Sequence, residues 1–150
     1  MKFIDKILDS ITMYRLVLYY LIFLLVIAVI LAFIGILPFS PLYLLVSVAF
    51  ILAISWISNK IFSWAFKAPT NVESVYISAL ILALILSPIN SFADLPLLFW
   101  ASVLTMASKY ILAIKSKHIF NPVAIAVALT AFGFSGSASW WIGTIYMLPF

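Results

Sequence analysis

An unbroken apolar run from Leu16 to Ile36 constrains this chain more than any other feature. A helix needs about 20 apolar residues to cross a bilayer, and this run is long enough. No small-residue cleavage site follows it, so it does not have the pattern of a secretory signal peptide. The composition agrees: 67% of the residues are hydrophobic and 8% are charged. A soluble domain is only about half apolar, so the sequence predicts an integral membrane protein.

Four more apolar stretches follow, which predicts an all-α polytopic membrane protein with five transmembrane helices. Pro-bearing or charged segments separate the stretches, which lie at about 16–36, 41–58, 72–88, 95–114 and 122–134. The third and fifth are shorter than the roughly 20 residues of a perpendicular crossing. Short segments of this kind either mark a site at mid-membrane depth or form short helices sheltered inside a bundle.

The two ends of the chain differ in pattern from the five-helix repeat expected over residues 16–134. Residues 1–15 alternate apolar and charged positions at helical spacing, which predicts an amphipathic helix in the interface, with a frayed tail as the alternative. Residues 135–150 are expected on the outer side, leading into a second repeat. Their aromatic side chains suit the belt at the lipid–water boundary: Trp140, Trp141 and Tyr146.

Positive residues fall into three groups, and the loops between the groups carry no Lys or Arg. The groups are Lys2, Lys6 and Arg15; Lys60 and Lys67; and Lys115 and Lys117. The positive-inside rule places all three on the cytoplasmic side of the cell inner membrane. The amino terminus is then cytoplasmic, while Asp94 and the carboxyl terminus are outside. Because the positive charge is scattered beside spans, the net charge of +4 does not indicate a nucleic-acid partner.

Polar residues also lie within the third and fourth stretches. Glu73 and Lys109 are both expected near the cytoplasmic ends of their helices, where they can form a structural ion pair. Hydroxyls follow one face of each helix, and either they bond across to the neighbouring helix or they face a ligand. These hydroxyls belong to Ser74, Ser78, Ser102, Thr105 and Ser108.

The densest polar chemistry lies between the fourth and fifth stretches, in the segment Lys115 to Pro122. Pro122 can open a helix at its first position, and Asn121 is a favoured N-cap whose amide both donates and accepts. This pattern favours a helix mouth that faces a polar ligand. His118 either hydrogen-bonds such a ligand or is a solvated contact to lipid phosphate.

Several kinds of chemistry are excluded for this chain's own side chains. Without cysteine it offers no thiolate ligand for a metal or an iron–sulfur cluster, and it contains one histidine. It has no carboxylate pair, no nucleophile with a base at recognisable spacing and no phosphate-binding glycine loop. We therefore expect no catalytic residues and no metal ligands, and any redox chemistry must come from a bound cofactor.

Four motifs together resemble a known family. They are Glu73-Ser74, the run from Ser78 to Pro88, Ser108-Lys109-Tyr110, and Lys117-His118-Ile119-Phe120-Asn121-Pro122. Over roughly residues 70 to 134 they look like the amino-terminal half of the NqrB/RnfD family. Its members are membrane subunits of the sodium-pumping NADH:quinone oxidoreductase and of the Rnf electron-transport complex. The basic loop running into Phe-Asn-Pro is the most specific of the four motifs.

The resemblance implies one half of an inverted-repeat fold, in a membrane subunit that carries flavin and passes electrons within a larger complex. The family attaches flavin mononucleotide to the threonine of a Ser-Gly-Ala-Thr type motif in its second half. That motif is absent here, because Ser135 to Ser139 lacks the threonine. The family also holds a non-covalent flavin, riboflavin or FMN, near the first Asn-Pro step, where Asn121 is the matching position.

The resemblance therefore implies a flavin-contacting wall in a redox complex rather than a self-contained enzyme. Asn121 would make polar contacts with the flavin, Phe120 would be a ring neighbour, and Lys117 and His118 would lie at the cytoplasmic mouth. Partners would be other membrane and redox subunits or a second five-helix repeat, together with the lipid bilayer. A solute channel or transporter on the same fold and a structural anchor for partner subunits are the alternatives.

Overall fold

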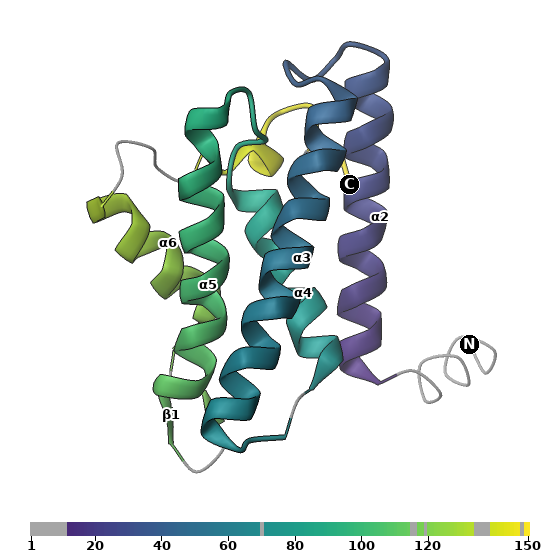
Figure 1. Ribbon diagram of the computed structural model, residues 1–150. Helices are drawn as coiled ribbons and strands as arrows, with labels where there is room; N and C mark the ends of the chain where they lie inside the picture. The colour runs from purple at the N-terminus through teal and green to yellow at the C-terminus, as the bar shows by residue number, and fades with distance from the viewer. Residues whose placement is uncertain (1–11, 70, 115–116, 119, 134–138, 148) are drawn as a thin grey trace, which may run out of the picture.

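The computed structural model describes residues 12–69, 71–114, 117–118, 120–133, 139–147 and 149–150 (Figure 1). In these residues five α-helices form, and the expected all-helical class is confirmed. They are α2 (Met13–Phe33), α3 (Pro41–Phe66), α4 (Val72–Ile85), α5 (Leu95–Ile111) and α6 (Pro122–Gly133). Single 3-10 turns form at η1 (Phe92–Asp94) and η2 (Trp141–Gly143). The two-residue strands β1 (Ala113–Ile114) and β2 (Lys117–His118) pair antiparallel between α5 and α6.

Local sequence signals fix where the helices begin. Pro41 and Pro122 open α3 and α6, where a missing N–H costs nothing because the first turn has no internal partner for it. Asn71 caps α4, because its side chain accepts from the backbone N–H of Ser74 at 3.3 Å. The expected amphipathic helix of residues 1–15 falls mostly on residues 1–11, which lie outside the described part of the chain.

Helix α3 runs eight residues beyond the expected boundary at residue 58 and ends at Phe66. Two polar side chains in this extension have partners in the structure. Lys60 lies over the Trp56 ring, with its ammonium 4.5 Å from the ring centroid. Asn59 accepts from the Tyr110 hydroxyl at 2.8 Å. The helix continues past both residues to Phe66, and Lys67, whose backbone is left-handed at φ 48°, ends it.

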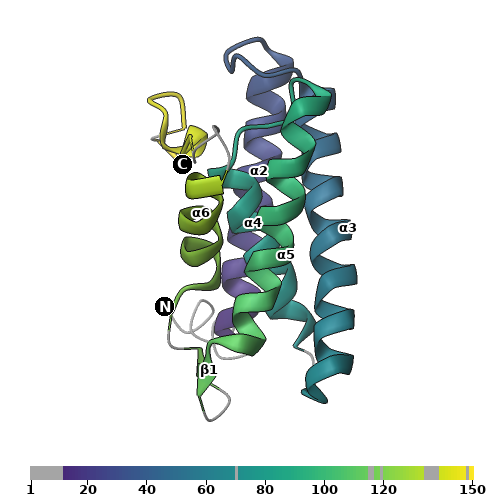
Figure 2. The ribbon, with the colours of Figure 1, turned by 60° about the vertical axis from the view of Figure 1, so that its left-hand side comes forward.

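By length and composition, α2 and α3 are long and apolar enough to cross a membrane, with 21 and 26 residues. The other apolar helices are shorter: α4 has 14 residues and α6 has 12. The short α4 lies inside the bundle, where α2, α3, α5 and α6 all contact it (Figures 1 and 2). Its run from Leu82 to Ile85 is entirely buried. Of the two interpretations of the third stretch, the structure favours a helix sheltered by its neighbours.

Helix α4 stops in the interior, and the carboxyl-terminal segment satisfies the backbone carbonyls that the stop exposes. The Trp141 indole N–H donates to the carbonyl of Ala83 at 3.1 Å and to that of Leu86 at 2.9 Å. The backbone N–H of Trp140 donates to the carbonyl of Ile85 at 3.0 Å. An unsatisfied buried carbonyl costs free energy, so these bonds let a helix end where water is excluded.

This arrangement corrects the expectation for Trp141, which is 3% exposed and packs in the core instead of joining an aromatic belt. Trp140 and Tyr146 remain exposed. The carboxyl end folds back along the bundle, where the carbonyl of Phe150 accepts from the Tyr20 hydroxyl of α2 at 2.8 Å (Figure 1). Of the aromatic segment at 135–150, residues 135–138 and 148 lie outside the described residues.

The opposite end of the bundle from the start of α2 carries a compact cap in front of α5 (Figure 1). The Asp94 carboxylate accepts from the backbone N–H groups of Asn90 and Ser91, both at 2.9 Å, and closes a capping box with Ser91. These two hydrogen bonds hold the pKa of Asp94 below its ordinary value.

We expect Asp94→Ala to lower the free energy of unfolding by about 1 kcal/mol at neutral pH, since a capping oxygen is lost. A lowered folded-state pKa means that this stability is present above the ordinary aspartate pKa of about 4 and is lost as the pH falls through the folded value. Thermal unfolding of both proteins in detergent should therefore show the difference at pH 7 and a narrowing gap below about pH 4. A gap that stays constant with pH would contradict the role of the charge.

Candidate functional site

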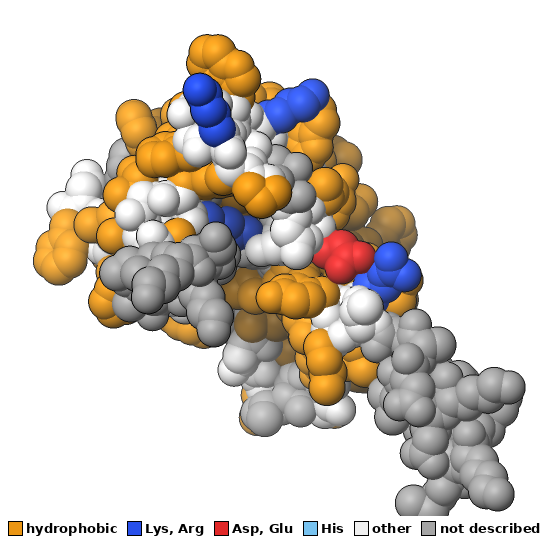
Figure 3. All heavy atoms as spheres, turned by 90° about the horizontal axis from the view of Figure 1, so that it is seen from below, with side chains coloured by type: hydrophobic (Ala, Val, Ile, Leu, Met, Phe, Trp, Pro, Cys, Tyr) orange, Lys and Arg blue, Asp and Glu red, His pale blue; other side chains and the backbone are white. Residues whose placement is uncertain are grey.

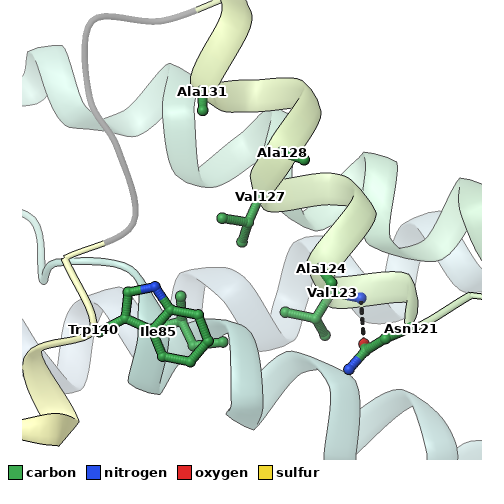
Figure 4. Close-up of a pocket in the computed structure, with 8 residues that line it drawn as sticks. All are labelled: Ile85, Asn121, Val123, Ala124, Val127, Ala128, Ala131 and Trp140. Carbon is green, nitrogen blue, oxygen red and sulfur yellow. Dashed lines mark hydrogen bonds between the residues drawn. The ribbon is translucent and has the colours of Figure 1, made fainter.

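A half-open cavity of about 320 Å³ lies between α6 and the end of α4. One wall is the α6 face built from Val123, Ala124, Val127, Ala128 and Ala131. Ile85 and Trp140 form the facing wall, and Asn121 lies at one end (Figure 4). Val123, Ala126 and Thr130 of α6 are buried, and of these three Val123 also lines the cavity. The small residues of α6 thus leave a hollow beside the bundle that is mainly apolar and polar at one end.

Asn121 performs the cap that the sequence predicts. Its side-chain oxygen accepts from the backbone N–H of Val123 at 3.0 Å, in the first turn of α6 (Figure 4). That bond commits the oxygen and fixes the orientation of the amide, so the NH₂ group is the part of the side chain left to donate to a ligand. The residue is exposed, which gives a ligand access to this group.

The other three residues that the family resemblance implies are placed less directly. Phe120 is 59% exposed and is not among the residues that line the cavity. Lys117 and His118 form β2, which places their backbone just before α6, but their side chains lie outside the described part of the structure. The structure thus brings Asn121 to the cavity and leaves the roles of the other three as predictions.

Arg15, Lys60, Lys67 and Lys109 lie where α2, α4 and α6 begin and where α3 and α5 end, and we call this the basic end (Figures 1 and 3). Glu73 lies there too, but it does not pair with Lys109. Its carboxylate accepts from the Arg15 guanidinium at 2.9 Å, which is the one ion pair between described side chains. The expected Glu73–Lys109 pair is therefore corrected to Arg15–Glu73.

The geometry of α4 explains this correction. Neighbouring residues on a helix point about 100° apart, so Glu73 and Ser74 cannot both face α5. Ser74 takes that position, and the Lys109 ammonium donates to its carbonyl at 2.6 Å and to its hydroxyl at 3.1 Å. Glu73 is turned toward α2, where Arg15 is the available cation. Lys109 is 7% exposed, so its charge is buried between α5 and α4.

Most hydroxyls of α5 bond within their own helix instead of across to α4. Ser102 donates to the carbonyl of Leu98 and Thr105 to that of Ala101, both at 2.7 Å. Ser108 donates to the carbonyl of Thr105 at 2.9 Å. Such bonds satisfy a hydroxyl without a partner helix. Of the two interpretations offered for these hydroxyls, neither describes Ser102 or Thr105. Ser108 also donates to the carbonyl of Pro122 in α6 at 3.4 Å, and Lys109 makes the side-chain hydrogen bonds from α5 to α4.

Trp140 and Ile85 line the cavity although no sequence pattern placed them there. Both come from segments far from the first turn of α6 along the chain, and the bond between the Trp140 N–H and the Ile85 carbonyl holds them together. The pattern of a tryptophan pair after the fifth apolar stretch was the available signal, but it is equally typical of an interfacial belt.

A second cavity, of about 260 Å³, lies between α3 and α5. Its lining is almost wholly apolar, with Ser58 as the polar member among side chains such as Ile54, Phe62 and Val103. It offers little for recognition of a polar ligand. Among the described residues, no group of three or more His, Cys, Asp or Glu side chains is placed to hold a metal ion.

Comparison with known proteins found no family model, no curated protein and no solved structure that matches this chain. The assignment of a function therefore depends on the chain's own residues and geometry.

The revised pairing predicts the outcome of two double-mutant cycles. Arg15→Gln and Glu73→Gln should show a coupling energy of up to about 1 kcal/mol, because exposed ion pairs contribute little. Glu73→Gln and Lys109→Gln should instead be additive within about 0.5 kcal/mol, since the two side chains share no bond. Free energies of unfolding in detergent provide the measurement, and coupling only in the second cycle would restore the original pairing.

Proposed function

We propose that this chain is a multi-pass subunit of the cell inner membrane that forms one wall of a non-covalent flavin site in an electron-transport complex. The observation that supports this most is the cavity beside α6, where Asn121 lies at one end and Trp140 faces a wall of small residues. The resemblance to the membrane subunits of the Rnf complex and the sodium-pumping oxidoreductase names the same residue, Asn121, from the sequence side.

The chemistry of the cavity fits an isoalloxazine ring. A volume of about 320 Å³ is at the lower end of the range for small-molecule sites, and mostly apolar linings with a few polar groups are typical of them. Ala124 and Ala128 would let a flat ring approach the helix closely, and the exposed Trp140 offers an aromatic surface. The Asn121 amide group can donate to a ring carbonyl while its oxygen holds the cap.

A bound flavin would supply the electron-transfer chemistry, and the chain would position it and adjust its potential. The cavity reaches the amino end of α6, where Asn121 lies, and this positive end of the helix dipole favours negative charge nearby. Lys117 and His118, just before α6, would add donors at the cytoplasmic mouth, with Phe120 as a ring neighbour. Other redox subunits or a second five-helix repeat would close the open side of the cavity.

The membrane part of the proposal is supported by two observations. Helices α2 and α3 have the length and composition of membrane spans. The Lys and Arg side chains of the described residues gather at one end of the bundle, as the positive-inside rule requires of a cytoplasmic face (Figure 3). Helices α4, α5 and α6, which pack against other helices of the bundle, would complete the five-helix repeat.

The chief rival is a solute transporter, whose sites often form where a helix is interrupted and its backbone groups are free. Helix α4 ends inside the bundle, but Trp141 and Trp140 donate to the carbonyls at its end. Because these carbonyls already have partners, they are not free to bind a solute, which favours a flavin site over a transport site at the end of α4.

We expect Asn121→Asp to keep the helix cap and to lose bound flavin, because it retains the capping oxygen and replaces the amide donor with an acceptor. Ala128→Leu should also lose flavin, because it fills the cavity from its exposed wall. Leu129→Phe is the matched control, since this exposed neighbour does not line the cavity. The measurements are flavin absorbance per protein and reduction potential in the assembled complex.

Thermal unfolding of each variant checks folding independently of flavin content. A cap role alone predicts little change on Asn121→Asp in either quantity. Normal assembly of Asn121→Asp and of Ala128→Leu, with wild-type flavin content and potential, would refute the site.

The topology can be tested on a clean background, because the chain has no cysteine. Lys60→Cys, at the basic end, should react with an impermeant thiol reagent only from the cytoplasmic face. Phe92 is 90% exposed and lies beside Asp94 at the other end of the bundle, so Phe92→Cys should react only from the outer face. Labelling in oriented vesicles decides, and reaction of Lys60→Cys from outside would reverse the orientation.

A further inference from the structure

The Lys109 ammonium is a buried charge whose described partners are all neutral. The residue is 7% exposed, and the ammonium donates to the carbonyl and the hydroxyl of Ser74. The carboxylate nearest to it along α4, that of Glu73, is taken by Arg15. Among the described side chains, Lys109 thus has no anionic partner.

Burial of such a charge is costly unless a counter-charge or several hydrogen bonds compensate it. The position of Lys109 adds to the cost. Ser74 lies in the first turn of α4, at the positive end of the helix dipole, where a cation is disfavoured and an anion is favoured. Two independent features, the buried ammonium and the helix end, therefore both favour an anion at this point.

The donors at this point match an oxyanion. An ammonium has three N–H groups, and the described acceptors take up two of them. The Ser74 hydroxyl accepts from Lys109 and still has its own proton to donate. One N–H of Lys109 and the O–H of Ser74 are thus two adjacent donors, which suits the oxygens of a tetrahedral phosphate.

The surface around this point would attract such a ligand. Arg15, Lys60 and Lys67 lie at the same end of the bundle, and Figure 3 shows Lys and Arg side chains gathered on this face with the acidic side chain beside one of them. A field of one sign raises the local concentration of anions. Basic pockets between helix ends on the cytoplasmic side are also a recurrent way of holding anionic lipid headgroups.

We propose that Lys109 and Ser74 form a binding site for a phosphate group, presented either by an anionic phospholipid or by free phosphate. The site is separate from the proposed flavin cavity, because neither residue lines that cavity. It therefore does not depend on the proposed electron-transport function, and loss of one site should leave the other intact.

The first test compares thermal unfolding of the detergent-purified protein with added phosphatidylglycerol and with added phosphatidylcholine. The wild type should gain about 5 °C in Tm from phosphatidylglycerol over phosphatidylcholine at saturation. Lys109→Gln keeps a donor for the Ser74 carbonyl but removes the charge, so it should lose most of this gain. Lys60→Gln, a cation of the same end that rests on Trp56, is the control and should keep it.

A second arm replaces the lipid with potassium phosphate, compared with potassium chloride at equal ionic strength. A Lys109-dependent gain in this arm as well identifies free phosphate as a sufficient ligand, whereas a gain in the lipid arm alone identifies the headgroup. The proposal is overturned if the wild type gains in neither arm, if Lys109→Gln gains as much as the wild type, or if Lys60→Gln loses the gain equally.

A measurement on the wild type alone covers the case in which Lys109→Gln does not fold. Acetic anhydride labels lysine amines, and mass spectrometry reports the rate at each lysine. Phosphatidylglycerol or phosphate should slow labelling of Lys109 several-fold relative to phosphatidylcholine or chloride and should leave Lys60 nearly unchanged. Equal labelling rates at Lys109 under all conditions would overturn the proposal.

Discussion

The rest of the structure depends on how helix α4 is allowed to stop inside the bundle. Four other helices contact it, and the residues at its end, Ala83 to Leu86, are buried, so their carbonyls need partners within the protein. The Trp141 indole and the Trp140 backbone supply the missing donors. The same contact brings the carboxyl-terminal segment against α4 and sets Trp140 opposite α6. The hydrogen bonds that satisfy the end of α4 therefore also place one wall of the candidate cavity.

At the basic end, two adjacent residues of α4 have different polar partners. Glu73 and Ser74 are adjacent, but they face different neighbours. The Glu73 carboxylate accepts from Arg15, and the Ser74 hydroxyl accepts from Lys109. The exposed pair contributes little to stability. The buried ammonium is the energetically demanding group, and it is left with neutral partners among the described residues. This division of roles is what makes a phosphate group a reasonable occupant beside Ser74.

Asn121 shows that a structural role and a binding role can share one side chain without conflict. The oxygen holds the first turn of α6, and this bond fixes where the NH₂ group points. Three alanines of α6 line the cavity, and their side chains are too small to fill the space beside them. A cap, a row of small residues and a distant tryptophan together produce a hollow with a polar end, which is the feature on which the proposed flavin site rests.

The sequence by itself determined the local features: five apolar stretches that form helices, proline at the start of α6 and the cap at Asn121. These depend on residues within a turn of each other, whose geometry is nearly fixed by the helix. Tertiary structure decided the partners of Glu73 and Lys109, the burial of Trp141 and the lining of the cavity. Arg15 is 58 residues from Glu73, and the Trp141 indole is 58 from Ala83. Contacts over such separations depend on how whole helices rotate and pack, which no local pattern specifies.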